Sequence, residues 1–206
     1  MAESSLAVTP GSGLNLRTNS RSVGGSTVHE QGVMSAEGNA ATYTASAKAV
    51  SLLTSASHLL VLQADGTNYI RLRRVTIQQV GVATSATPAD ISIVRSTTAG
   101  STFGTPITPV ALDLADSAFS GVCGSLPSVK GTVSTASPLL QARLPIATST
   151  ITPGYRWEWN ARYDNSKSIV TGTATSSGIV VYLTTGIAAT TPTVDIEVEF
   201  VVTSYI

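Results

Sequence analysis

The sequence predicts an all-β protein: an antiparallel β-sandwich, with a jelly roll favoured over an immunoglobulin-like sandwich, preceded by an extended N-terminal arm. Three observations predict this fold. Several short segments alternate apolar and polar residues, which is typical of strands with one buried face. Gly and Pro separate these segments, and no segment has the periodicity of a long helix. Charged residues make up 12% of the chain, against about 25% in an average soluble protein.

The first 47 residues are predicted to form the arm. Gly, Ser, Asn and Thr dominate residues 1–47, and the apolar residues are too scattered to define a buried face. Because ordering one residue costs roughly 1–2 kcal/mol of backbone entropy, a segment that buries so little is expected to become ordered only against a partner. Residues 23–28 predict a short hairpin, since Gly24-Gly25 can supply the positive φ of a tight turn. A flexible linker is the alternative for these residues.

Residues 48–206 are predicted to form the body of the sandwich. Residues 96–145, which five prolines interrupt, predict loops with short strands and one helical turn at residues 112–116. Residues 90–95 are expected to pair antiparallel with the preceding strand, because turn formers connect the two. The strands that we expect in the body are residues 50–53, 59–63, 69–84, 90–95, 155–163, 169–174, 179–184 and 194–205.

The longest predicted strand, residues 69–84, changes phase in its middle. Ile70 and Leu72 lie on one face of an ideal strand, whereas Val75 and Ile77 lie on the other. A change of phase predicts a β-bulge at the two arginines between these pairs, or a strand that passes from one sheet to the other.

The last predicted strand alternates apolar with acidic residues, so one buried and one solvated face are expected. Asp195, Glu197 and Glu199 share the solvated face. Calcium binding is not favoured, because residues two apart on a strand are separated by roughly 7 Å and the three carboxylates cannot reach one ion. Two interpretations are better: a solvated face without partners, or cross-strand ion pairs whose candidate partners are Arg71, Arg73, Arg156 and Arg162.

No catalytic or cofactor-binding motif occurs in the sequence, so we expect neither an enzyme nor a cofactor. Residues 100–104 have the glycine spacing of a nucleophile elbow but place Thr102 at the centre. The only two histidines, His29 and His58, are far apart in the chain, which does not favour a metal site. Cys123 has no Lys, Arg or His within five residues, so a packed, unreactive thiol is expected.

Three aromatic residues, Tyr155, Trp157 and Trp159, share one face of a predicted strand. Flat aromatic side chains can stack on sugar rings, which makes the three residues candidates for glycan contact. Large aromatics more often belong to the core, and alternation with charged residues is also typical of a core strand. We therefore favour the core interpretation and keep glycan contact as the alternative.

The chain carries twelve Lys and Arg and twelve Asp and Glu, so its formal net charge is zero. A neutral chain has no overall attraction to nucleic acid or to an anionic membrane, and neither partner is expected. The N-terminus lacks the pattern of a secretory signal, and no apolar run reaches the roughly 18 residues that span a bilayer. The single cysteine excludes an intramolecular disulfide, which favours folding in a reducing cytoplasm.

The arm carries three short motifs, residues 8–13 (VTPGSG), 23–25 (VGG) and 28–33 (VHEQGV). A Thr-Pro-Gly turn followed by a Val-Gly-Gly hairpin and a short polar strand resembles a segment common near the N-termini of tailed-bacteriophage virion proteins. In such arms a basic stretch normally follows the hairpin, whereas residues 34–37 here read MSAE. The arm therefore lacks the basic stretch of the proteins it resembles, and the surface on which it docks stays open.

The body also carries turn and strand patterns that are similar to a β-sandwich found among phage head and tail structural proteins. The resemblance covers roughly residues 8–33 and 58–204. In the body it depends on residues 72–77 (LRRVTI), 87–91 (TPADI), 94–100 (VRSTTAG), 105–113 (TPITPVALD), 168–170 (SIV) and 195–198 (DIEV).

The resemblance implies a virion structural protein, made in the host cytoplasm and acting as an auxiliary capsid protein that decorates or cements the shell. Its arm would bind the major capsid protein or another virion protein, because an arm can add a strand to an open sheet edge of a neighbour. A homotrimer is expected, since lattice proteins sit at symmetry axes. The arm residues expected to contact the partner are Arg17, Arg21, Val23, Gly24, Gly25 and Val28.

Two alternatives to the decoration protein stay open. One is a phage tail, fibre or receptor-binding component that contacts host glycans. The other is a carbohydrate-binding module outside any virion. The arm argues against the free-standing module, which has little use for such a segment.

Overall fold

The computed structural model describes residues 18–23, 26–31, 40–85, 87–149, 154–161, 168–187 and 192–204. The chain divides into two compact units, Met1–Asn39 and Ala40–Ile206. The described residues of both units include β-strands and contain no helix. The all-β fold class is therefore as the sequence predicts.

The described residues of the first unit form an antiparallel pair of strands, β1 (Thr18–Val23) and β2 (Ser26–Gln31). Val23 at the end of β1 lies opposite Ser26 at the start of β2. The structure thus contains the hairpin that residues 23–28 predict. Gly24 and Gly25, which we expect to form its turn, lie outside the described residues.

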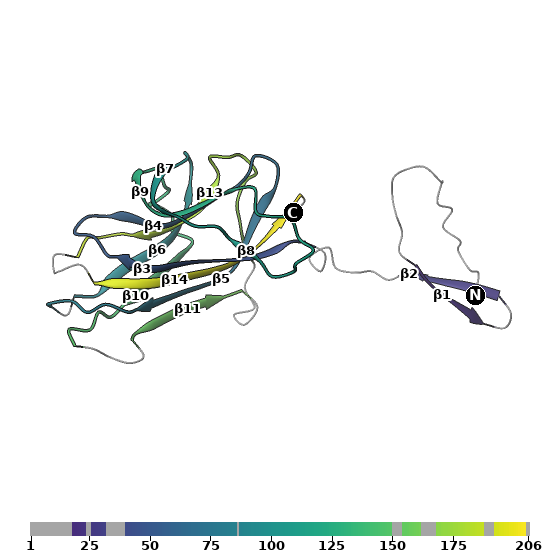
Figure 1. The fold of residues 1–206 in the computed structure, drawn as a ribbon, viewed down its shortest axis with the longest axis horizontal. Coiled ribbons are helices and arrows are strands. Elements are labelled where there is room, and N and C mark those ends of the chain that lie inside the picture. The colour runs from purple at the N-terminus through teal and green to yellow at the C-terminus, as the bar shows by residue number, and fades with distance from the viewer. Residues whose placement is uncertain are drawn as a thin grey trace. The chain divides into compact units, whose positions relative to one another are not determined.

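The second unit is a sandwich of two antiparallel sheets (Figure 1). The first sheet has the order β11, β5, β14, β3, β8, and β12 also pairs with β5. Its strands are β3 (Thr42–Ser51), β5 (Tyr69–Gln79), β8 (Val110–Ala111), β11 (Arg156–Asn160), β12 (Ile169–Val170) and β14 (Thr193–Thr203). The second sheet has the order β10, β6, β13, β4, β9, β7. Its strands are β4 (Ser57–Gln63), β6 (Ala89–Ser96), β7 (Ser101–Pro106), β9 (Val122–Val129), β10 (Leu140–Leu144) and β13 (Gly178–Leu183).

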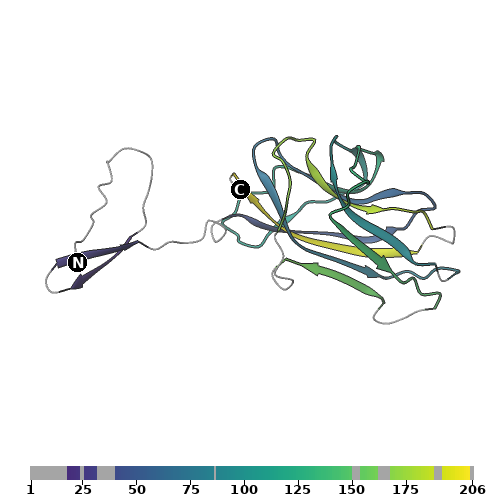
Figure 2. The same ribbon diagram turned by 180° about the vertical axis from the view of Figure 1, so that it is seen from behind.

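One hydrophobic core lies between the two sheets. Leu72 of β5 and Phe200 of β14 belong to the same buried cluster as Leu60 of β4 and Ile93 of β6. Each fully buried side chain of this kind contributes roughly 1.5–3 kcal/mol relative to an exposed one. The same two layers are seen from behind in Figure 2. Burial alternates along β5 and along most of β14, as one-sided burial of a strand requires.

The change of phase in β5 is a β-bulge. Leu72 pairs with Phe200 of β14 and Arg74 pairs with Glu199, so Arg73 is the extra residue. The extra residue shifts the alternation of faces by one position in the second half of the strand. The apolar residues before and after the bulge therefore lie on the same face and are buried in the same core. The alternative, a strand that passes between sheets, is wrong.

The partner expected for β6 is wrong. β6 pairs with β10 and β13 in the second sheet, whereas β5 lies in the first. The connection from β5 to β6 therefore crosses from one sheet to the other. Turn-forming residues predict a short connection. The same residues serve a hairpin within one sheet and a short connection between two sheets, so the sequence does not distinguish the two.

The body begins earlier than the predicted residue 48. β3 lies between β14 and β8, and its residues Tyr43, Ala45 and Ala47 are buried in the core. The boundary between the compact units falls after Asn39. Alternating small residues such as Ala45 and Ser46 gave this strand the composition of the arm, and burial shows that it belongs to the body.

The region of residues 96–145 holds more strand than expected, since β7, β8, β9 and β10 all lie in it. The predicted helical turn at residues 112–116 is a turn without a helix. The Asp113 carboxylate accepts a hydrogen bond from the backbone N–H of Ala115 at 2.9 Å, and the backbone N–H of Asp116 donates to the Asp113 carbonyl at 3.1 Å. A side-chain bond of this kind competes with the helix and favours a turn.

Candidate functional site

The three aromatic residues at β11 differ in their burial. Trp159 is buried, and Trp157 is half-buried against the core. Tyr155, just before β11, is 44% exposed. The core interpretation therefore describes the two tryptophans, and a flat platform of all three rings does not form. Tyr155 lines a pocket.

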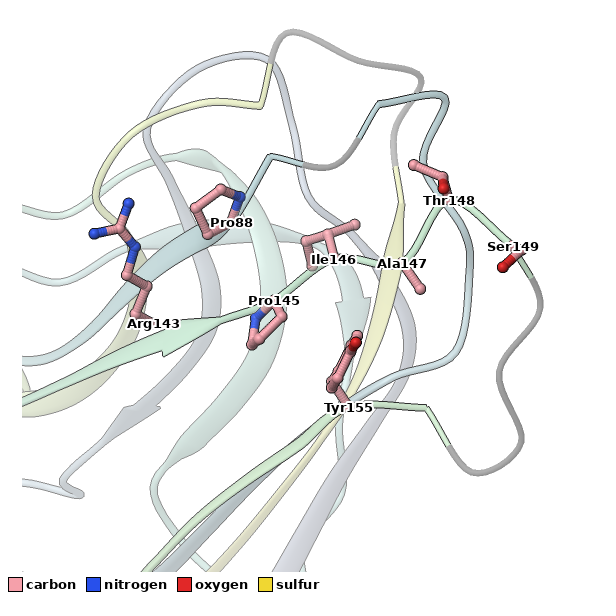
Figure 3. Close-up of a pocket in the computed structure, with 8 residues that line it drawn as sticks. All are labelled: Pro88, Arg143, Pro145, Ile146, Ala147, Thr148, Ser149 and Tyr155. Carbon is pink, nitrogen blue, oxygen red and sulfur yellow. The ribbon is translucent and has the colours of Figure 1, made fainter.

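The pocket beside Tyr155 lies at one end of the sandwich and has a volume of about 530 Å³ (Figure 3). Arg143 comes from β10, and Pro88 immediately precedes β6. In the view of Figure 3, Pro145 lies between Arg143 and Tyr155. The residues that line the pocket are Pro88, Arg143, Pro145, Ile146, Ala147, Thr148, Ser149 and Tyr155.

Hydrogen bonds hold the wall of this pocket to the core. The backbone N–H of Gln79 donates to the carbonyl of Tyr155 at 2.8 Å, and the buried Gln79 side chain bonds to the backbone of Ala147. The backbone N–H of Ala83 also donates to the Ala147 carbonyl, at 3.0 Å. The segment after β10 is thereby fixed to the end of β5. A smaller pocket of about 230 Å³ shares Ala147 and Ser149 with the larger one.

The side chains of the larger pocket suit a ligand with flat apolar faces and polar edges. The ring of Tyr155 and the prolines supply apolar surface, while Arg143, Thr148 and Ser149 supply polar groups. Nε of Arg143 lies 3.6 Å from a carboxylate oxygen of Asp90, and both side chains are exposed. An exposed ion pair of this length is weak, so the guanidinium can donate to a ligand. Tyr155 is among the residues that the sequence predicts for glycan contact, whereas Arg143 carries no local motif.

Two acidic residues of β14 make ion pairs with Arg74 of β5. Arg74 lies 2.5 Å from Glu197 and 3.6 Å from Glu199. The bulge at Arg73 places Arg74 opposite Glu199. Cross-strand ion pairing is thus present on this face, through an arginine that is not among the candidates named from the sequence.

The first acidic residue of β14, Asp195, lies where the register between β14 and β3 shifts. Its carboxylate lies 3.1 Å from Nζ of Lys48 and accepts a hydrogen bond from the backbone N–H of Ala49 at 2.8 Å. Ala49 has a φ of 49°, an uncommon value for a residue with a side chain. Among the described residues, no group of three or more His, Cys, Asp and Glu could hold a metal ion.

Burial shifts the pKa of Cys123 and of His58. Burial raises the pKa of the Cys123 thiol to about 12. Burial and the nearby charge of Lys130 lower the pKa of His58. The rings of His58 and Tyr182 pack edge to face, with their centroids 5.6 Å apart. Both shifts disfavour the charged form, as expected for groups that pack and do not react.

The predicted contact residues of the arm are only partly described. Arg21 on β1 lies opposite Val28 on β2, and Val23 ends β1. Arg17, like the two glycines of the turn, lies outside the described residues. The structure thus brings Arg21 and Val28 together as a cross-strand pair.

No helix in the described part of the chain is long and apolar enough to cross a membrane. No protein-family model matches this sequence, and neither a curated protein nor a solved structure matches it.

Proposed function

We propose that the body is a jelly roll. The chain crosses between the sheets at each step from β3 through β4 and β5 to β6, and again from β10 to β11 and from β13 to β14. These eight strands give the orders β11, β5, β14, β3 in one sheet and β10, β6, β13, β4 in the other. Two interleaved sets of four strands are how a jelly roll winds, and viral capsid domains and lectins use this architecture. β7, β8 and β9 then form an insertion between β6 and β10.

We propose that the protein is a virion structural protein, a capsid decoration or cement protein that attaches to the shell through its arm. The observation that supports this function is the separate unit Met1–Asn39, in which β1 and β2 pair only with each other among the described strands. A hairpin of two strands is at best marginally stable alone in water. A further surface, such as the sheet edge of a shell protein, would stabilise it by adding main-chain hydrogen bonds. Many copies on one lattice would add avidity.

Removal of residues 1–39 tests this function. The truncated protein should keep its thermal unfolding midpoint and lose co-sedimentation with empty heads of the same phage. The variant Val129→Asp, which changes an exposed residue of the body, should still co-sediment and serves as the matched control. Full occupancy of the heads by the truncated protein would contradict the proposal.

A second candidate function is glycan contact by a tail or receptor-binding component, and the pocket at Tyr155 is the observation that favours it. An exposed aromatic ring beside an arginine and two hydroxyl side chains has the groups that a sugar needs. Saturation-transfer NMR with host-surface oligosaccharides tests this function. Tyr155→Ala should abolish the transfer and Val129→Ala should preserve it; transfer that survives Tyr155→Ala, or no transfer to the unmodified protein, would count against it.

A further inference from the structure

An apolar strip lies on the surface of the body at residues 110–114. Val110 is 64% exposed, Leu112 is 60% exposed, and Leu114 is fully exposed. Ala111, between the first two, packs against the core instead. Val110 belongs to β8, and Leu112 and Leu114 lie in the turn that follows it, so the three aliphatic side chains are exposed close together along the chain. Clustered exposure of this kind marks a surface that binds another protein.

This strip also lies at a sheet edge. β8 is the last strand in the order of its sheet, and β3 is the only strand of the described part of the chain that pairs with it. The pairing with β3 continues past β8, since the backbone N–H of Leu112 donates to the Thr42 carbonyl at 2.8 Å. The side of β8 that faces away from β3 is therefore a short edge, two residues long, to which another strand can add.

The charges of the edge and of β1 are opposite. Residues 110–117 contain Asp113 and Asp116 and no basic residue, whereas residues 17–23 contain Arg17 and Arg21 and no acidic residue. Opposite charges favour this pairing over pairing between two copies of the same edge. Among the described strands β1 pairs with β2 alone, so the proposal assigns its other side to a third strand.

We propose that β1 of a second copy of this chain adds to the free edge of β8 and covers Leu112 and Leu114. Such a contact joins two different surfaces, the arm of one copy and the edge of the next. A heterologous contact closes into a ring when the rotation permits, and a trimer is the smallest such ring beyond the dimer. The inference rests on the proposed role of the arm as the attachment segment, and it names a second copy as a partner of that arm.

The molar mass in solution, measured by light scattering without any shell protein, tests the inference. The full chain should have a mass of about 63 kDa, three times the 21.1 kDa of one copy. Leu112→Asp combined with Leu114→Asp should reduce the mass threefold without changing the unfolding midpoint, because both side chains are exposed. The matched control, Val122→Asp with Val129→Asp, places the same charges on exposed residues of β9 and should stay trimeric.

A reciprocal variant tests the charges. Arg17→Glu with Arg21→Glu should also give the single-copy mass. Mixing this protein with the aspartate variant should give a dimer of about 42 kDa, twice the 21.1 kDa of one copy, because the intact arm of the aspartate variant meets the intact edge of the other variant. An unmodified chain that is monomeric at all concentrations would overturn the inference, as would an oligomer that survives either double substitution. Co-sedimentation with heads is measured separately: a monomer that still binds heads overturns only the inference, and a trimer that does not bind them overturns only the proposed function.

Discussion

The side-chain amide of Gln79 bonds to both backbone groups of Ala147. Nε2 of Gln79 donates to the Ala147 carbonyl at 3.2 Å, and Oε1 accepts a hydrogen bond from the Ala147 N–H at 3.0 Å. Nε2 also donates to the carbonyl of Gly81 at 2.9 Å. One buried side chain thus joins the end of β5 to the segment that forms the wall of the Tyr155 pocket.

Replacement of Gln79 by Ala should lower the free energy of unfolding by roughly 2–3 kcal/mol, because buried backbone groups lose their partners. Gln78→Ala is the matched control, since Gln78 is the preceding residue on the half-exposed face of β5, and its effect should stay within about 0.5 kcal/mol. Urea unfolding followed by tryptophan fluorescence measures both variants. Equal effects of the two substitutions would contradict the role assigned to the Gln79 amide.

Two deletions locate the boundary of the body. Removal of residues 1–39 should leave the unfolding midpoint unchanged, whereas removal of residues 1–45 also deletes Tyr43 and Ala45 from the core. Tyr43 stacks on Phe200 with ring centroids 5.5 Å apart, and its hydroxyl donates to the Ser117 carbonyl at 2.8 Å. Loss of a buried aromatic side chain alone costs roughly 3–5 kcal/mol. The longer deletion should therefore unfold or melt far lower by circular dichroism, and equal midpoints for the two proteins would place the boundary after residue 45.

The bulge in β5 shows what the sequence can predict about this fold. Ile70 and Ile77 are out of phase for an ideal strand, and the sequence contains that information directly. The consequence, that Arg74 and not Arg73 faces Glu199, depends on which residue becomes the extra one. Sequence alternation does not decide this, because the neighbouring strand and its register make the choice.

The sequence signal for some strands is weak for physical reasons. β9 contains Pro127, and β7 ends in Pro106; because Pro cannot donate a backbone hydrogen bond, it argues against a strand in any sequence-based prediction. Pro127 of β9 lies opposite Phe103 of β7, and β7 is the edge strand of this sheet. Proline is tolerated near a sheet edge.

The sequence does not predict the pocket at Tyr155 for another reason. Pro88 and Arg143 come together only through the pairing of β6 with β10.

The stability of the body should fall as the pH falls below the ordinary histidine pKa of 6.5. Burial, and then the charge of Lys130, lower the pKa of His58 in the folded protein, so in this range the unfolded chain binds more protons and stability is lost on acidification. Removal of residues 1–39 leaves His58 as the only histidine. Urea unfolding of this truncated protein between pH 7.5 and about pH 5 should show the decrease, and His58→Gln should flatten it. An unchanged slope in His58→Gln would assign the decrease to other groups.

Cys123 should act as a reporter of opening and not as a reactive group. Its side chain is 5% exposed, and burial raises the pKa of the thiol to about 12. Since the thiolate is the nucleophile, a thiol with this pKa holds only about one part in 10⁴ of thiolate at pH 8, and burial also blocks the reagent. Labelling by a maleimide should therefore be at least a thousandfold slower in the folded protein than in 6 M guanidinium chloride. Cys123→Ala gives the background rate, and the destabilised Gln79→Ala variant should label faster than Gln78→Ala if labelling requires unfolding. Equal labelling rates in folded and unfolded protein would show that β9 opens freely around this residue.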